Sequence, residues 1–509
     1  MSTLLSERSV AAAAAALGFP FSRDEARAYA EALLHLNDSL RAAVEGLPPP
    51  SLVLPLDGPN GHIGAGVLDA HCFAAEFEQE PTRRGPLTGM TAAVKDNIAI
   101  AGIPMTLGCP FLSDLVPDRS ATVVSRLRSG GARIIGTLTM DALGVSGDGL
   151  GVGSTDTATC ANPWNPSHAT GGSSSGAAVA VARGLVDIAL GTDQGGSVLL
   201  PAAWCGVVGL KPTHGLIPTA GVVGLHGRLD HIGPITRTAD EMAVAFAALN
   251  KRTRGATSEL TASGARGRTK SLPGVRIGAL VEGFEHEGAD PGVIATAEKA
   301  LHHLKAAGAT ISRVSAPVHL ACGRLLPCLT TAGLWRAMNS ADEVVRRRYA
   351  SRRVADALVA RFRARADLLP ARVKMVLIFG HLAATGMFAY HRLATSRIPM
   401  YRAAYDRLFE ELDCLVMPTT SVPPPARRSD LVPYARLLRT LTRAHLGPLN
   451  VNTAPFNLTG HPALSVPVGL YRGLPVGLSI VGPHQSESLL FRVAAAGQGL
   501  LPNGLAAAH

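Results

Sequence analysis

The sequence is poor in charged and in aromatic residues. Of its 509 residues, 17% are charged, 5% are aromatic and 47% are hydrophobic. A chain with so few charges and so many apolar side chains is not intrinsically disordered, and it is long enough to bury a large core. The composition therefore predicts a globular protein and favours an enzyme.

The charges that are present give a net charge of +10. Arginines gather in the segments 252–268, 346–372 and 427–443. Nucleic-acid surfaces often combine such cations with aromatic side chains that stack on bases, and these segments hold few aromatic residues. We interpret them as solvated helix faces and expect no nucleic-acid partner.

Lysine is scarce: the chain has seven lysines among its 48 basic residues. Arginine stays charged at any physiological pH, whereas lysine can lose its proton when it is buried. In a chain that otherwise uses arginine, each retained lysine is a candidate for acid–base chemistry.

The seven cysteines lie far apart and form neither a CxxC pair nor a zinc-type spacing. This pattern predicts buried, reduced thiols, no metal site and a cytoplasmic location. Long apolar runs are also lacking. The segment 375–390 is too short to cross a bilayer, and the apolar run 10–17 lacks the basic flank of a signal peptide. We therefore expect a soluble protein without a membrane partner.

Residues 1–70 are predicted to form a helical N-terminal segment followed by a linker rich in proline and glycine at 47–70. Ser22 and Glu25 have the spacing of a capping box. Apolar residues then recur at helical spacing and give the helix one face to bury, against the body of the protein or in a homodimer. The residues of this face are Ala26, Tyr29, Ala30, Leu33, Leu36 and Leu40.

The remainder, residues 71–509, has an α/β pattern. Strand candidates alternate with helix candidates, which predicts a mixed, largely parallel central sheet flanked by helices. The segment 318–450 is mostly helical and is a possible pocket-lining insertion. The strand candidates are 91–94, 133–138, 186–190, 275–281, 309–314 and 414–417, and the helix candidates are 121–129, 176–183 and 287–307.

Three short stretches carry residues suited to catalysis. The stretch 170–176, Thr-Gly-Gly-Ser-Ser-Ser-Gly, opens an apolar helix, and 191–197, Gly-Thr-Asp-Gln-Gly-Gly-Ser, follows a strand. Glycines let backbone N–H groups turn toward one point, as an oxyanion hole requires. In the third stretch, Lys95 follows an apolar strand, where burial would favour its neutral, basic form.

Each stretch also has a purely structural interpretation. The serines could cap a helix, the Gly-Gly pair could be an ordinary turn, and Lys95 could form an ion pair with Asp96. The stretch 172–176 formally matches the GxSxG elbow of α/β-hydrolases, centred on Ser174. A turn-rich loop rather than a strand precedes it, so we set that interpretation aside.

Together the three stretches resemble the amidase signature family. The serines Ser173 and Ser197 are 24 residues apart, an interval familiar in that family. The resemblance covers roughly residues 86–483, weakly across 240–410, and looks most like bacterial amidases of nitrile-degradation pathways. Further matching segments are 201–206, 209–213, 230–234, 452–456, 460–462 and 473–477.

The resemblance implies the amidase-signature fold and a Ser–Ser–Lys triad that needs no cofactor and no metal. Ser197 would attack the amide carbonyl, and Ser173, behind a cis peptide bond with Gly172, would relay its proton to neutral Lys95. The backbone N–H groups of Gln194, Gly195, Gly196 and Ser197 would hold the oxyanion. Ser174 and Asp193 would support the site.

One departure from the family pattern lies beside the nucleophile. The family usually has an arginine two residues after it, and this chain has Leu199. Asp193 therefore loses an expected partner. A rewired active site, an altered substrate range and loss of activity all remain open.

The sequence thus predicts an amidase that cleaves a small-molecule carboxamide to a carboxylate and ammonia or an amine. Three alternatives stay open. The acyl group could pass to an amine in a biosynthetic enzyme. The chain could belong to an amidotransferase that amidates misacylated tRNA together with partner subunits, although the N-terminal helices fit this poorly. It could also be a catalytically altered pseudoenzyme because of Leu199.

Overall fold

The computed structural model describes residues 5–45, 72–145, 160–250, 271–340, 352–382, 388–426 and 449–498. The expected linker at 47–70 and the basic segments 252–268 and 427–443 therefore lie outside the described residues. In the described part, no helix is long and apolar enough to cross a membrane.

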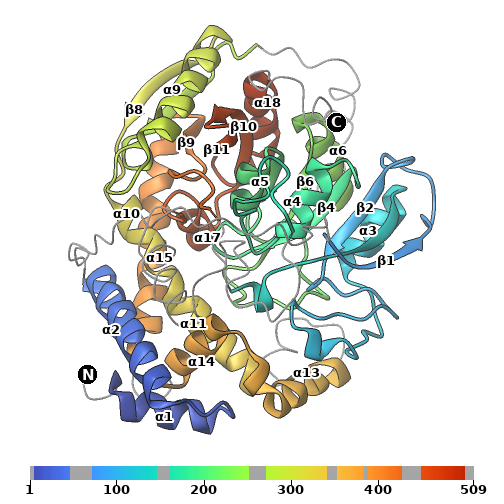
Figure 1. Cartoon of the computed structure of the whole chain (residues 1–509). Coiled ribbons are helices and arrows are strands. Elements are labelled where there is room, and N and C mark those ends of the chain that lie inside the picture. Colours follow the sequence, from blue (N-terminus) through green and yellow to red (C-terminus); the bar gives the residue numbers. More distant parts are fainter. Residues whose placement is uncertain are drawn as a thin grey trace.

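The protein is built on one sheet of eleven strands, in the order β1-β3-β2-β4-β6-β5-β10-β11-β9-β7-β8 (Figure 1). The strands are β1 (Phe73–Gln79), β2 (Thr91–Lys95), β3 (Arg133–Leu138), β4 (Ile188–Asp193), β5 (Val208–Lys211), β6 (His231–Thr236), β7 (Arg276–Leu280), β8 (Thr310–Val314), β9 (Cys414–Pro418), β10 (Ala463–Tyr471) and β11 (Leu474–Val481).

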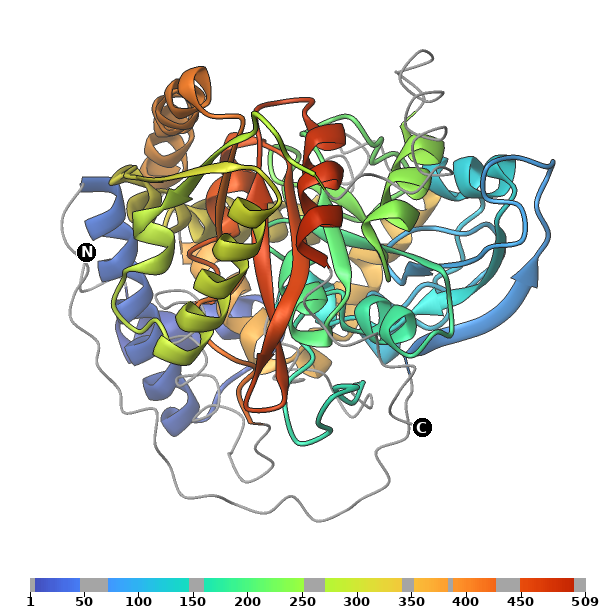
Figure 2. The same ribbon diagram turned by 90° about the horizontal axis from the view of Figure 1, so that it is seen from above.

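Two helix layers cover the sheet (Figures 1 and 2). Helices α4 (Ser175–Ala182) and α5 (Leu199–Cys205) pack together and contact strands β4, β5, β10 and β11. Helices α3 (Thr122–Gly130), α6 (Ala239–Leu249), α9 (Pro291–Ala306) and α18 (Glu487–Gly497) form the other layer. The short α8 (Val281–Phe284) follows β7. The main apolar core lies between the sheet and the layer of α3, α6, α9 and α18, whereas α4 packs on the sheet through a smaller cluster of its own.

The expected α/β class with a mixed, helix-flanked sheet is confirmed, but the expectation of a largely parallel sheet is wrong. The six strands expected from the sequence (β2, β3, β4, β7, β8 and β9) pair with one another only in parallel. Every antiparallel pair involves one of the strands that were missed, β1, β5, β6, β10 or β11. Three of these contain proline, which argues against a central strand when only the sequence is considered.

A second, helical part lies beside the sheet. It consists of α1 (Glu7–Ala16), α2 (Arg23–Glu45), α10 (Val318–Gly323), α11 (Leu326–Asn339), α13 (Arg352–Ala364), α14 (Ala371–Leu382), α15 (Phe388–Glu411) and α17 (Ala454–Thr459). Its side chains form their own apolar cluster. Within 318–450 the described residues are mostly helical, as expected.

The N-terminal helices α1 and α2 pack against α14 and α15 of the same chain (Figure 1). The capping box is confirmed: Ser22 N donates to Glu25 Oε2 over 2.9 Å, and Glu25 N donates to Ser22 Oγ over 3.3 Å. Tyr29 and Leu33 are buried, and Tyr29 Oη donates to Ala371 O. This apolar face is therefore buried against the body of the same chain, one of the two possibilities that the sequence left open, and the homodimer stays a prediction.

The seven cysteines are all buried and free, as expected. The arginine-rich segment 346–372 is only partly a solvated face. Arg361 makes a two-pronged contact with Asp114, with both N–O distances at 2.7 Å, whereas Arg372 is buried.

Candidate active site

The three stretches singled out in the sequence meet at one edge of the sheet. Lys95 is the last residue of β2, and Asp193 is the last residue of β4. These strands are parallel neighbours, so their carboxyl ends lie side by side. Ser173 and Ser174 lie just before helix α4, which contacts both strands.

Lys95 and Ser173 form a buried pair. Lys95 Nζ donates to Ser173 Oγ over 2.7 Å, and both residues are fully buried. The peptide bond between Gly172 and Ser173 is cis, as the resemblance implies. The alternative ion pair between Lys95 and Asp96 is not formed, because Asp96 accepts hydrogen bonds from the backbone and side chain of Thr106 instead.

The surroundings of Lys95 favour its neutral form. Burial lowers the pKa of its ammonium group from 10.5 to about 7, although the negative charges of Asp141 and Asp193 act in the opposite direction. An amine with a pKa near 7 is partly unprotonated at neutral pH and can therefore accept a proton.

Ser174 links the helix to the sheet. Its Oγ donates to Thr192 O over 3.2 Å and accepts from Thr192 N over 3.3 Å, and its side chain does not cap helix α4. The structural interpretation of this serine as a helix cap is therefore wrong. Its contacts hold the start of α4 against the end of β4.

The carboxylate of Asp193 organises the loop that carries Ser197. It accepts from Gly196 N and Val198 N, each over 2.7 Å. The side-chain amide of Asn457, on α17, donates to the same carboxylate over 2.7 Å. Asp193 is fully buried, so these charge-assisted bonds compensate for the lost hydration.

These contacts explain how the loop is held without the family arginine. Leu199 begins helix α5, and its side chain is fully buried in the main apolar core. Its backbone N–H also faces the Asp193 carboxylate, at 3.4 Å. N–H groups, rather than a guanidinium, therefore surround this carboxylate.

The contact between Asp193 and Gly196 corrects the expected oxyanion hole. Gly196 N already donates to the carboxylate and is not free to bind a second anion. The N–H groups of Gln194, Gly195 and Ser197 donate to no acceptor within the described part of the chain. Thr453 Oγ1 donates to Gly195 O over 2.8 Å and fixes the orientation of that peptide.

Ser197 is the most accessible member of the expected triad. It is 9% exposed, whereas Lys95 and Ser173 are 0% exposed. Among the hydrogen bonds of the described residues, none joins Ser197 Oγ to Ser173. In ligand-free enzymes such contacts often form only once the substrate is bound.

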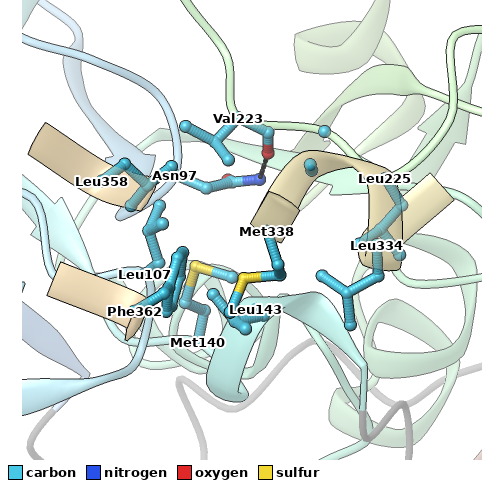
Figure 3. A pocket seen from close by; sticks show the side chains of 12 residues that line it. Asn97, Leu107, Met140, Leu143, Val223, Leu225, Leu334, Met338, Leu358 and Phe362 are labelled. Atoms are coloured by element: carbon cyan, nitrogen blue, oxygen red, sulfur yellow. Dashed lines mark hydrogen bonds between the residues drawn. The ribbon is translucent and has the colours of Figure 1, made fainter. Parts of the chain in front are cut away.

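Figure 3 shows an apolar pocket whose wall comes close to the candidate site through the segment that contains Leu143. Counting its open mouth, it holds about 360 Å³. One wall includes Leu143, whose neighbour Gly144 lies close to Ser173 Oγ. Helices α11 and α13 supply Leu334, Ala337, Met338, Leu358 and Phe362, so the segment 318–450 does line this pocket.

Asn97 is the polar side chain of this pocket. Its amide donates to Val223 O over 2.9 Å (Figure 3) and to Thr192 Oγ1 over 3.1 Å, and the second bond ties the pocket wall to the end of β4.

Sequence reasoning assigned no role to Asn457, Thr453 or Lys211. Lys211, on β5, is the second fully buried lysine, and burial lowers its pKa to about 7 against the charges of Asp193 and Glu487. It donates to His461 O over 2.6 Å and to Pro212 O over 3.2 Å. These carbonyl contacts give it a structural role. The scarcity of lysine was a usable signal for Lys211, whereas Asn457 is 264 residues from Asp193 and no local pattern marks it.

Replacing Asn457 with alanine tests whether this amide holds the loop. The variant leaves one side of a buried carboxylate without its donor, so we expect a loss of about 1–3 kcal/mol in the free energy of unfolding. Denaturant unfolding measures this loss. Asn339→Ala is the control, because the Asn339 side chain is exposed and its amide bonds only to Trp335 O within helix α11, while Arg363 contacts the backbone oxygen that the substitution keeps. Equal stability losses in the two variants would show that Asn457 has no special role.

Comparison with known proteins agrees with this geometry. The family model described as Amidase matches residues 69–491. One subunit of the glutamyl-tRNA(Gln) amidotransferase from Exiguobacterium sibiricum is 36% identical, over 86% of this chain and 90% of its own length.

Two solved structures are similar as well. The glutamyl-tRNA(Gln) amidotransferase subunit from Thermotoga maritima has a TM-score of 0.65 at 27% identity, covering 85% of this chain and 89% of its own. The peptide amidase from Stenotrophomonas maltophilia has a TM-score of 0.60 at 30% identity, covering 81% and 83%. The finer likeness to amidases of nitrile degradation stays a prediction. The chain therefore belongs to the amidase family and is an enzyme that acts on amide carbon–nitrogen bonds.

Proposed function

We propose that this protein hydrolyses a small-molecule carboxamide to a carboxylate and ammonia or an amine. The observation that carries the proposal is the buried Lys95–Ser173 hydrogen bond of 2.7 Å beside the partly accessible Ser197. A lysine with a lowered pKa supplies the base that a serine nucleophile requires.

In the proposed reaction Ser197 Oγ attacks the amide carbonyl and gives its proton to Ser173, whose own proton passes to neutral Lys95. The negative charge on the carbonyl oxygen is held by backbone N–H groups of Gln194, Gly195 and Ser197. Ser173 then returns a proton to the nitrogen as the carbon–nitrogen bond breaks. Water attacks the resulting acyl-enzyme by the same relay and regenerates Ser197.

The pocket beside this site supports an apolar substrate. Leucine, methionine and phenylalanine side chains supply most of its wall. Burying an aliphatic or aryl group against such a wall is favourable, whereas a charged group would lose its hydration and find few hydrogen-bond partners there. We propose that the acyl part of the substrate occupies this pocket.

A second candidate follows from the likeness to amidotransferase subunits, which is 36% identity over 86% of the chain. In that case the protein would act together with other subunits. A separate alternative keeps the acyl-enzyme but passes the acyl group to an amine instead of to water. Co-purification of partner proteins would favour the first, and new amides formed when amines are added would favour the second. The pseudoenzyme alternative loses its main support, because the Asp193 carboxylate has donors without the family arginine.

Ammonia release from a panel of aliphatic and aryl amides tests the proposed hydrolysis. We expect turnover by the wild type and a loss of at least about a thousandfold in Ser197→Ala, because no other group can form the acyl-enzyme. Ser167→Ala is the control, since Ser167 is an exposed serine in the preceding loop. A Ser197→Ala variant that keeps most of its activity would exclude this nucleophile. Release from none of the amides would favour acyl transfer.

Narrowing the pocket tests the proposed acyl site. Ala337→Leu adds bulk to the wall, so we expect kcat/KM for aryl or branched amides to fall about tenfold or more. Activity on propionamide should change little, because a small acyl group does not reach this wall. Met338→Leu, a nearly volume-conserving change in the same wall, should alter neither. A uniform loss on small and large amides would place the acyl group elsewhere.

A further inference from the structure

One carboxylate oxygen joins two segments of the candidate site. Asp230 directly precedes strand β6, and its Oδ1 accepts three hydrogen bonds. The backbone N–H groups of Leu225 and His226 donate over 2.9 and 3.2 Å, and the side-chain amide of Gln194 donates over 3.2 Å. An ionised carboxylate only accepts hydrogen bonds, so the amide of Gln194 presents its nitrogen to it.

The loop around Asp230 is shaped to hold its carboxylate in one place. The backbone N–H groups of Leu229 and Asp230 both donate to His226 O, which closes a turn. Gly224 has no side chain, and a Cβ there would lie 2.2 Å from Asp230 Oδ2. The position of the carboxylate is therefore fixed by its own loop, and Gln194 binds it from outside that loop.

The two segments have different places in the proposed reaction. Leu225, whose N–H the carboxylate binds, lines the apolar pocket together with Val223 (Figure 3). Gln194 is the first residue after strand β4, and its backbone N–H is one of those proposed to hold the oxyanion. Asp230 thus connects the wall that faces the acyl group to the loop that faces the carbonyl oxygen.

The bond to Asp230 is the contact that restrains Gln194. The next peptide along the loop is fixed on both sides, because Thr453 donates to its oxygen and its N–H donates to the Asp193 carboxylate. Within the described part of the chain, no hydrogen bond holds the backbone N–H or the backbone oxygen of Gln194. Its side chain, which is 5% exposed, anchors it instead.

We propose that Asp230 is a positioning residue that holds Gln194 and thereby sets the direction of the N–H groups in the oxyanion hole. Such groups stabilise the developing charge when they already point at it, and a loop that moves loses part of this stabilisation. This role rests on the proposed function, because it requires an oxyanion to be bound. The alternative is a purely structural role, in which Asp230 only closes its own turn.

Gln194→Met tests this role, because it removes the donor to Asp230 and nearly keeps the length of the side chain. We expect kcat to fall about tenfold or more and KM to change less than about twofold, since the hole binds the oxyanion rather than the ground-state amide. The loss should be equal for small and large acyl groups, unlike the loss in a variant of the pocket wall.

Gln498→Met is the matched control. The side chain of Gln498 also makes hydrogen bonds, to Arg237 O and from Ala239 N, and these lie outside the candidate site. The same substitution there should leave kcat unchanged.

A double-mutant cycle with Asp230→Asn separates positioning from structure. Asparagine keeps an acceptor oxygen for the N–H groups of the loop, but it loses the charge that strengthens the bond to Gln194. Alone, Asp230→Asn should lower kcat severalfold. In the Gln194→Met background it should lower kcat no further, because its effect passes through Gln194.

The rate at which a serine-directed fluorophosphonate labels Ser197 is measured in the same variants. The phosphoryl oxygen of this probe occupies the oxyanion hole, and no amide substrate has to be known. Gln194→Met and Asp230→Asn should lower this rate together with kcat. If the wild type is labelled but hydrolyses no amide, the proposed hydrolysis fails and the labelling rates still decide the role of Asp230.

The role of Asp230 is overturned if Gln194→Met keeps both rates, or if the losses from Gln194→Met and Asp230→Asn multiply. It is also overturned if the loss depends on the size of the acyl group, or if Gln498→Met loses as much. A wild type that is neither labelled nor active would overturn both this role and the proposed function.

Discussion

The buried carboxylate of Asp193 is the constraint on which the candidate active site depends. Asp193 is the last residue of strand β4 and is fully buried, so hydrogen-bond donors of the protein have to replace water around its carboxylate. The backbone N–H groups of Gly196 and Val198 and the side-chain amide of Asn457 donate hydrogen bonds to it. The loop between β4 and α5 is thereby folded tightly around it, with Ser197 at the point that remains accessible. An arginine is not needed for this arrangement.

The position of the catalytic candidates could be predicted from the sequence because it follows from strand order. Lys95 and Asp193 each end an apolar strand, and parallel neighbours bring their ends together. The helix that starts at Ser175 adds the serine stretch to the same edge. Local sequence patterns are sufficient to predict the positions of these residues, because each lies at the end of a predicted strand or at the start of a predicted helix.

Other features depend on contacts between distant segments and could not be predicted. Asn457 reaches Asp193 from another layer of the fold. The antiparallel centre of the sheet is made of strands that contain Pro234, Pro467 and Pro475, which the sequence analysis did not recognise as strands. A Gly-Gly motif also does not determine the geometry of its loop. The sequence therefore could not predict that Gly196 N donates to the Asp193 carboxylate rather than to an oxyanion.

The central claim is that neutral Lys95 activates Ser197 through Ser173. The most direct test is the rate at which a serine-directed fluorophosphonate labels the enzyme across about pH 5 to 9, with the adduct located by mass spectrometry. The account predicts a single adduct on Ser197. Its rate should rise with pH as Lys95 loses its proton near pH 7, and Lys95→Arg should not be labelled because a guanidinium does not act as a base. An adduct on another serine, a rate independent of pH, or equal labelling of Lys95→Arg would contradict it.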